Sequence, residues 1–397
     1  MRTMKDNQDQ WRGFDLRRRK EKIMRAFRLE EVTEADEVPV IAATPTYFAF
    51  GSNDKPSDYF SNPASMVRYQ EQSCQKHLAD VRDDFVPYFM PWFGTGIMAA
   101  AFGCPYRLEC PPGEDPGILA GCVAEVTDVA RLKPPDPGSS PPMRRVLDCI
   151  EAALRSSDLP VGLTDMNSPL STLGQMCGAT NLYTWMYSEP QAVHDLMDMV
   201  TEALISWVRV QKELIGEPDG YSNGLQGVWS PNGGVWLSDD DLVLIGPDLY
   251  EEFVVPRYSK IFTAFGGGHL HFCGDGSHQA SNINAIAGLT AVNNSPMYNL
   301  EAFTRLAARL RPGLVVELQD VAPIDAGYYA RLFPCLGRLR GVMVATFVED
   351  LVGMSEEGAS VPVCWKSRDH ANDLVLGARS AARAFLGTRA GGSGGAA

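Results

Sequence analysis

The second half of the chain alternates between short apolar runs and amphipathic segments. Apolar runs bounded by Gly, Pro or Asn predict buried strands, and apolar positions three and four residues apart predict helices. The expected strands cover residues 269–272, 288–293, 314–318 and 341–345, and the expected helices cover 277–287, 300–310, 325–336 and 371–386. This regular order predicts parallel strands whose outer faces are covered by helices.

The first half contains the same kinds of element, separated by longer insertions. Strands are expected at residues 38–43, 159–163 and 224–229, with a further short one at 123–126 inside a Pro- and Gly-rich loop. Helices are expected at 17–29, 62–84 and 143–156, at 169–215 with breaks near Gly178 and Pro190, and at 247–265 with a kink at Pro256. Proline at the first position of several of these helices favours that placement, since no amide hydrogen is needed there.

About eight short strands in 397 residues favour an α/β fold, namely a (β/α)8 TIM-type barrel with extra N-terminal helices. A doubly wound open sheet is the alternative, but no Gly-x-Gly-x-x-Gly follows the first expected strand. We expect residues 1–36 to form a charged helical extension, residues 37–388 a single barrel domain, and residues 389–397 a flexible Gly-rich tail.

Composition narrows the classes of partner. The chain has 35 Lys and Arg against 49 Asp and Glu, a net charge of −14, which argues against binding to nucleic acid or to an anionic membrane surface. No apolar run approaches the roughly 20 residues of a membrane-spanning helix, and no secretory signal follows the N-terminal basic cluster. We therefore expect a cytoplasmic protein, in which the nine irregularly spaced cysteines are thiols.

The most informative stretch is His-Leu-His-Phe-Cys at residues 269–273, which ends an expected strand just before a helix. In a barrel, the C-terminal ends of strands hold the active site. Alternate residues of a strand point the same way, so His271 and Cys273 can reach one metal ion, and zinc accepts such mixed ligands. From spacing alone, the pair also fits two ordinary buried residues. His269 can lie beside the pair or bond to it from behind.

Carboxylates near other strand ends are candidates for chemistry. Asp239 and Asp240 precede an expected helix, where Asp commonly caps the helix start. If they belong to the site instead, they are the candidate catalytic residues, acting in acid–base transfer. Asp165 and Asn167 follow a strand and are candidate substrate-binding residues, with loop capping as the alternative.

Aromatic residues supply further candidate contacts with a substrate. Trp229 and Trp236 can form an apolar wall, although Trp is common in protein cores. Tyr47 lies in an apolar and aromatic stretch, residues 43–51, directly after the first expected strand.

Five segments together resemble the uroporphyrinogen decarboxylase superfamily, which includes the decarboxylase and the zinc methyltransferases that exchange methyl groups with corrinoid proteins. The resemblance extends over about residues 17–386. It rests on the opening helix and strand at 25–40, the segment before a long helix at 168–178, the Pro-containing helix start at 187–194, the Pro-x-x-Tyr-x-x-Phe-x-x-Pro-like run at 246–256, and the His-x-Cys-Gly element at 271–274.

The resemblance implies a metal site and an activity. In the methyltransferases the His-x-Cys element supplies two zinc ligands and a cysteine near the C-terminus a third, which assigns His271, Cys273 and Cys364, with Cys335 as the competitor of Cys364. A family Glu ligand is missing from residues 290–295, and Glu317 is a speculative replacement. The implied function is zinc-dependent transfer of a methyl group between a thiol or other small molecule and a separate corrinoid-binding protein.

Two other functions stay open at this point. Decarboxylation of a tetrapyrrole is disfavoured because residues 43–51 contain no arginine, whereas the decarboxylase grips substrate carboxylates with an Arg-rich motif there. A non-catalytic binding protein that kept the barrel is the remaining alternative, since a fold alone does not determine a function.

Overall fold

A computed structural model describes most of the chain. The described residues are 15–43, 55–111, 114–216, 222–223, 228–231, 234–294, 300–321, 327–347, 351–354, 360–363 and 368–392. Within these ranges, no helix combines the length and the apolar character that crossing a bilayer requires.

Six parallel strands form the central sheet, in the spatial order β1-β10-β9-β8-β7-β6. Their bounds are β1 (Val40–Ala43), β6 (Trp236–Ser238), β7 (Gly268–His271), β8 (Leu289–Asn294), β9 (Val315–Val321) and β10 (Val342–Phe347). Almost every described residue of these strands is buried, as expected for parallel strands covered on both faces.

Backbone hydrogen bonds extend this sheet into a ring of eight strand positions. The segment after residue 83 joins β1, because the Asp84 amide donates to the Val40 carbonyl at 2.8 Å. The same segment pairs in parallel with the next one through the bridge Phe89↔Val161, and that second segment reaches β6 through the bridge Asn167↔Ser238. The ring therefore returns to β6, which places eight strand positions around one core.

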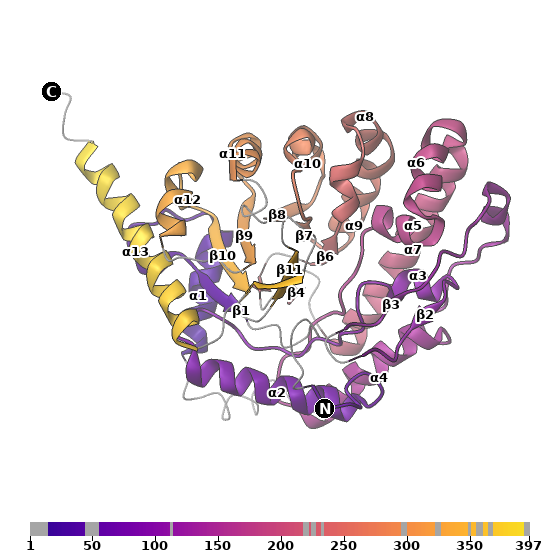
Figure 1. Ribbon diagram of the computed structural model, residues 1–397, viewed down its shortest axis with the longest axis horizontal. Coiled ribbons are helices and arrows are strands. Elements are labelled where there is room, and N and C mark those ends of the chain that lie inside the picture. Colours follow the sequence, from indigo (N-terminus) through magenta and orange to yellow (C-terminus); the bar gives the residue numbers. More distant parts are fainter. Residues whose placement is uncertain are drawn as a thin grey trace.

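Helices surround the strands (Figure 1). They are α2 (Pro63–Asp80), α3 (Ile97–Ala101), α4 (Pro141–Ser156), α5 (Pro169–Cys177), α6 (Ala179–Ser188), α7 (Pro190–Ile215), α8 (Pro247–Leu249), α9 (Val255–Ala264), α10 (Ala280–Ala285), α11 (Leu300–Arg309), α12 (Tyr328–Leu336) and α13 (Arg368–Gly392). The expected breaks near Gly178 and Pro190 are confirmed, because α5, α6 and α7 meet at these residues.

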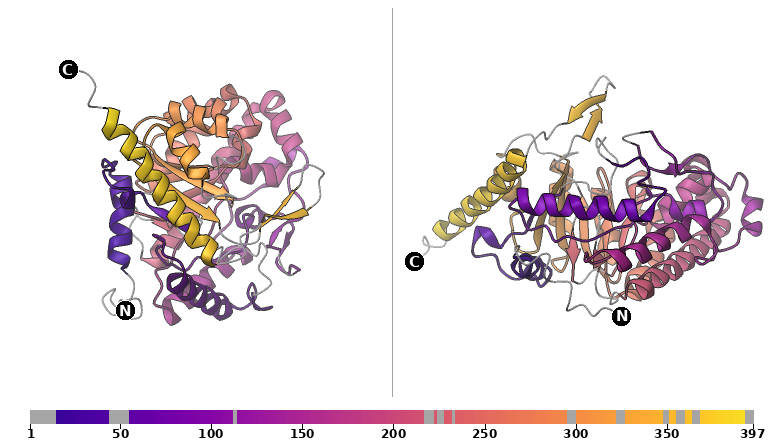
Figure 2. Two further views of the ribbon diagram at one scale, coloured as in Figure 1. Left: turned by 60° about the vertical axis from the view of Figure 1, so that its left-hand side comes forward. Right: turned by 90° about the horizontal axis from the view of Figure 1, so that it is seen from below.

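Both ends of the barrel carry additional elements. Helix α1 (Leu16–Phe27) lies on one side, and the hairpin of β11 (Leu351–Met354) with β12 (Ser360–Val363) stands away from the body on the other side (Figure 2). Because β11 follows the C-terminal end of β10, the hairpin marks the end of the barrel at which strands finish.

Several local predictions were wrong in detail. Residues 123–126 form no strand; Val126–Arg131 is a 3-10 helix, and the small hairpin of this loop is β2 (Tyr106–Arg107) with β3 (Gly117–Ile118). The expected kink at Pro256 is a five-residue π-helical segment, Tyr250–Val254, that ends two residues before the proline. Helix α13 continues to Gly392, past the expected start of the tail.

Candidate metal centre

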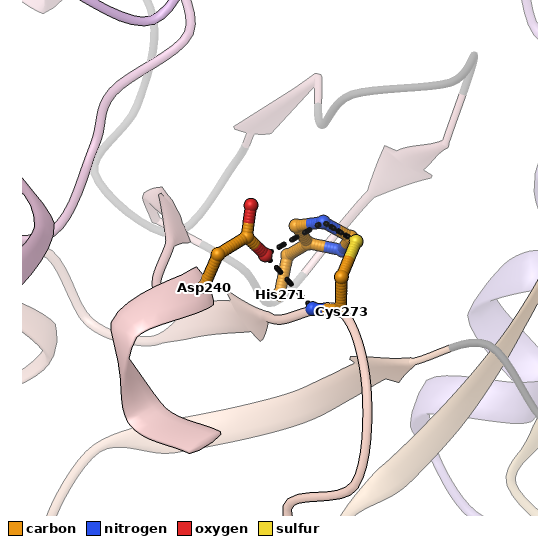
Figure 3. A group of neighbouring side chains, drawn as sticks. All are labelled: Asp240, His271 and Cys273. Carbon is orange, nitrogen blue, oxygen red and sulfur yellow. Dashed lines mark hydrogen bonds and ion pairs between the residues drawn. The ribbon is translucent and has the colours of Figure 1, made fainter. Parts of the chain in front are cut away.

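Three side chains converge at the C-terminal ends of β6 and β7 (Figure 3). His271 is the last residue of β7, Cys273 follows two residues later, and Asp240 begins the 3-10 helix after β6. The Cys273 Sγ lies 3.7 Å from His271 Nε2, which in turn lies 3.9 Å from Asp240 Oδ1. One donor atom from each residue lies within 4.8 Å of the other two.

These distances fit a tetrahedral metal ion. Zn–N and Zn–O bonds of about 2.0–2.2 Å and a Zn–S bond of about 2.3 Å place ligand atoms about 3.3–3.6 Å apart. The observed separations of 3.7 and 3.9 Å are only slightly longer. A thiol, an imidazole and a carboxylate are donors that zinc accepts. The Cys273 amide also donates to Asp240 Oδ1 at 2.8 Å, which holds the loop against the carboxylate.

The orientation of the His271 ring follows from the strand register. Pairing of β7, β8 and β9 brings His271, Asn293 and Glu317 into one row across the sheet. Asn293 Nδ2 donates to Glu317 Oε2 at 3.3 Å, because a carboxylate can only accept. Asn293 Oδ1 therefore faces His271 Nδ1, 2.8 Å away, and accepts its hydrogen. This leaves the lone pair of His271 Nε2 free to bind a metal ion.

A second histidine lies two residues earlier on β7, deeper in the barrel. His269 is fully buried, and its Nδ1 lies 2.9 Å from Glu317 Oε1, although the angle of this contact falls outside hydrogen-bond geometry. The Trp236 indole stacks on both histidine rings, with centroids 5.6 Å from His269 and 5.8 Å from His271. The wall of the site behind His271 is therefore aromatic and closely packed.

Asp239 is held by hydroxyl groups under the site. Its Oδ1 accepts hydrogen bonds from Ser168 at 3.0 Å and from Ser171 at 3.4 Å, and its Oδ2 accepts one from Tyr250 at 2.9 Å. Ser168 also caps α5, and Tyr250 opens the π-helical segment, so the carboxylate joins three elements. Burial raises the pKa of Asp239 to about 7, while hydrogen bonds from neighbouring hydroxyls oppose that rise.

Asp165 is the second buried carboxylate near the metal candidates. Its Oδ1 accepts a hydrogen bond from Ser238 Oγ at 3.3 Å, and its Oδ2 has no hydrogen-bond partner among the described residues. Burial raises the pKa of Asp165 to about 7, and the negative charge of Asp240 contributes to the rise. A carboxyl group with this pKa can take up or release a proton near neutral pH.

Comparison with known proteins identifies the family. The sequence profile described as uroporphyrinogen decarboxylase (URO-D) matches residues 18–216, half of the chain. The chain belongs to this family.

Relatives of known activity support the same grouping. A methylated-thiol–coenzyme M methyltransferase from Methanosarcina mazei is 22% identical over 196 residues, which cover 47% of each protein, so the match spans about half the length of that relative. A solved structure of a methyltransferase from Methanosarcina mazei superimposes with a TM-score of 0.63 at 15% identity and covers 91% of this chain and 98% of its own. This likeness confirms the expected barrel fold.

Two residues that the sequence assigned to the site are not described. Cys364, the expected third metal ligand, and Tyr47, a candidate substrate contact, lie outside the described residues. Cys335, the competitor of Cys364, is exposed on α12, where its Sγ donates to the Arg331 carbonyl. The exposure of Cys335 does not fit a residue that packs in the core, and its place on an outer helix separates it from His271 inside the barrel.

The other assigned residues divide into two groups. Asp165, Asn167, Asp239 and Asp240 lie at the strand ends around β6, and their roles in catalysis and substrate binding stay predictions. Trp229 does not: it lies in β5 (Trp229–Ser230), with Lys20 of α1 5.2 Å from the centre of its ring. Because β5 leads into the start of β6, this residue reaches the barrel from the α1 end, and Trp236 supplies the aromatic wall instead.

Asn293 is the residue that sequence reasoning missed. The sequence argument searched residues 290–295 only for a metal-binding Asp or Glu and found neither, so Asn293 received no role. Glu317 was considered as a metal ligand, but it is fully buried and bonded to Asn293. The position of Asn293 in the next strand could have indicated its role, because matching positions in neighbouring parallel strands lie side by side.

Proposed function

We propose that this family member is a zinc-dependent methyltransferase that moves a methyl group between a thiol or another small molecule and a separate corrinoid-binding protein. The main support for this proposal is that His271 Nε2, Cys273 Sγ and the Asp240 carboxylate converge at the end of the barrel where active sites lie. The named activity of the Methanosarcina mazei relative, which concerns a methylated thiol, agrees with this chemistry.

His271 and Cys273 would hold the zinc ion, with Cys364 and Asp240 as candidates for the remaining positions. A bound zinc ion lowers the pKa of a coordinated thiol, which keeps that thiol anionic and nucleophilic at neutral pH. Asp240 is exposed, with 63% of its side-chain surface accessible, so a small-molecule thiol would have access to the position beside it where the zinc ion would be held.

The chain's own residues would prepare this step. Asn293 fixes the His271 ring with Nε2 toward the metal, and the Trp236 ring excludes water from the face behind it. Asp165 Oδ2 is the candidate acceptor for the proton that a substrate thiol releases, since it is buried, without a hydrogen-bond partner among the described residues, and close enough to Asp240 to sense its charge. Asp239 holds α5 and the π-helical segment in place through its bonds with Ser168 and Tyr250.

Metal analysis of protein purified without chelators tests the proposal. We expect one tightly held zinc ion per chain, lost in His271→Ala and Cys273→Ser and retained in Cys335→Ser, which is the matched control on an outer helix. Zinc-loaded protein should then transfer the methyl group of methylcobalamin to coenzyme M. The change in absorbance of the cobalamin measures this transfer. Wild-type levels of zinc in Cys273→Ser, or decarboxylation of uroporphyrinogen without methyl transfer, would overturn the proposal.

A further inference from the structure

Two cysteines face each other in the loop that covers α3 and α5. Cys104 follows α3, and Cys122 lies 18 residues later, beyond the β2–β3 hairpin. The Cys104 amide donates to the Ala99 carbonyl at 3.1 Å, and the Cys122 amide donates to the Met176 carbonyl at 2.9 Å. Both backbones are thus held by helices, and the two Sγ atoms are 3.1 Å apart.

This separation exceeds a disulfide bond of about 2.05 Å by only about 1 Å, a gap that side-chain rotation can close. The thiol of Cys104 donates its hydrogen to Cys122 Sγ. That bond lowers the pKa of Cys122, and the same bond together with burial raises the pKa of Cys104. Cys104 is 4% exposed, whereas Cys122 is half-buried, so an oxidant reaches Cys122 first.

We propose that Cys104 and Cys122 form a reversible redox pair that a small-molecule disulfide oxidises to an intramolecular disulfide. The thiolate of Cys122 attacks one sulfur of the small disulfide and releases its other half as a thiolate. Cys104 then gives its proton to the released thiolate and attacks Cys122 Sγ, which expels the second half. Two cysteine thiols are oxidised, and one small disulfide is reduced to two thiols.

The remaining described cysteines outside the metal centre lack this combination. Cys110 is half-buried, but burial raises the pKa of its thiol, and its Sγ donates to the Leu108 carbonyl. Cys74, Cys149 and Cys177 are buried, and burial raises the pKa of each thiol to about 12. Cys335 is exposed, but its Sγ donates to a backbone carbonyl of its own helix. The pair also lies outside the metal centre, so the inference is independent of the proposed function.

A disulfide here would fix the segment at Cys122, beyond the β2–β3 hairpin, to the end of α3. This segment already rests on the end of α5, since the amides of Cys122 and Val123 both donate to Met176. Ser168 caps the start of α5 and donates a hydrogen bond to Asp239. Oxidation would therefore restrict the motion of the segment at Cys122, which packs on α5, the helix that supports the buried Asp239 carboxylate.

Thiol mapping after incubation of the full-length protein with glutathione disulfide tests this inference. Free thiols are blocked after denaturation, and cleavage after Arg107 and Glu114 separates Cys104, Cys110 and Cys122 for mass spectrometry. We expect a Cys104–Cys122 cross-link that dithiothreitol reverses. In Cys104→Ser, we expect glutathione to remain attached to Cys122, because the resolving thiol is missing.

Cys335→Ser is the matched control and should leave the cross-link unchanged. Circular dichroism checks that the serine variants fold. The cross-link in the wild-type protein tests the inference even if a variant does not fold. Wild-type protein in which Cys104 and Cys122 stay free while Cys335 is glutathionylated would overturn the inference. A cross-link of either residue to a different cysteine would overturn it as well.

Discussion

At the residue scale, the two nitrogens of His271 have separate tasks. Nδ1 is bonded to Asn293, and Nε2 faces Cys273. Partners that bond to the far nitrogen of a ligating histidine fix its tautomer and ring orientation, and their loss typically weakens metal binding. Asn293 is therefore a positioning residue for any metal that His271 holds.

Asn293→Ala should lower the affinity for zinc by about 10- to 100-fold, as is typical when such a partner of a ligating histidine is removed. The measurement is competition with a chelator of known affinity, which does not depend on activity. The control is Asn181→Ala, whose exposed amide donates to the Ala124 carbonyl away from the metal centre. Equal zinc affinities of Asn293→Ala and wild type would contradict the positioning role.

Asp165 gives the stability of the protein a defined dependence on pH. Its pKa of about 7 in the folded state lies above the ordinary value of 3.8, so the folded chain keeps a proton that the unfolded chain has released. The stability that the neutral form provides is complete below about pH 4 and is lost as pH rises to about 7. The loss is at most about 4 kcal/mol, at about 1.4 kcal/mol per pH unit.

Asp165→Asn removes this titration. The free energy of unfolding of the variant, relative to wild type, should therefore rise between pH 5.5 and pH 8 by up to about 2 kcal/mol, because only the part of the titration between pH 5.5 and about pH 7 falls in this range. Urea denaturation of metal-free protein at both pH values measures it, with Asp248→Asn at an exposed position as the control. A difference from wild type that does not change with pH would show that Asp165 is ionised in the folded state.

At the element scale, irregular segments support the site. The π-helical segment Tyr250–Val254 turns the Tyr250 hydroxyl toward Asp239, and Ser168 caps α5 while donating to the same carboxylate. Such π segments occur frequently at functional sites. Strand β7, which ends in His271, begins at Gly268, where there is no room for a side chain. A Cβ atom at Gly268 would lie 1.9 Å from Phe262 Cδ1 of α9.

Gly268→Ala should destabilise the protein by about 1–3 kcal/mol or more, because an added methyl group overpacks a closed core. Thermal or urea denaturation measures the loss. Adding Phe262→Leu should recover part of it, which a double-mutant cycle detects as a coupling energy. Gly313→Ala is the control, since nothing lies within 4 Å of the Cβ position there. Additive effects of Gly268→Ala and Phe262→Leu would contradict this contact.

At the scale of the whole molecule, a buried ionic cluster joins the two ends of the described chain. Asp84 Oδ1 accepts a bond from Lys22 of α1 at 2.8 Å, and its Oδ2 lies 3.4 Å from Arg379 of α13. The same Oδ2 accepts the Val40 amide of β1 at 3.0 Å. Carboxylates here take places that backbone carbonyls occupy in an ordinary strand ladder, which explains why this part of the ring is not a regular strand.

Helix α1 is also part of the barrel core. Phe27 is 7% exposed, and its ring centre lies 5.5 Å from that of His269 inside the barrel. Phe27→Ala should therefore lower the free energy of unfolding by about 3–5 kcal/mol, the usual cost of removing a buried aromatic ring. Arg17→Ala, at an exposed position of the same helix, is the control. A loss as small as that of the control would instead support residues 1–36 as a separate extension.

Prediction from sequence succeeded where the signal is local. Strands β7 to β10 and helices α5 to α7 lie close to their expected ranges, since apolar periodicity and helix-start prolines act over a few residues. The segments around Phe89 and Val161 contribute only isolated bridges to the ring. The sequence predicts a strand at residues 159–163, but prolines around Phe89 hide the strand pattern there, so the second position of the ring could not be read from the sequence.

The sequence by itself determined the alternating elements of the barrel and the placement of His271 and Cys273 together at the end of one strand. Only the tertiary structure decided which residues join them. Asp240 follows the strand on one side, Asn293 lies on the strand on the other side, and Glu317 lies one strand further. Periodicity fixes the face on which a side chain lies, whereas register between distant strands depends on how the whole core packs.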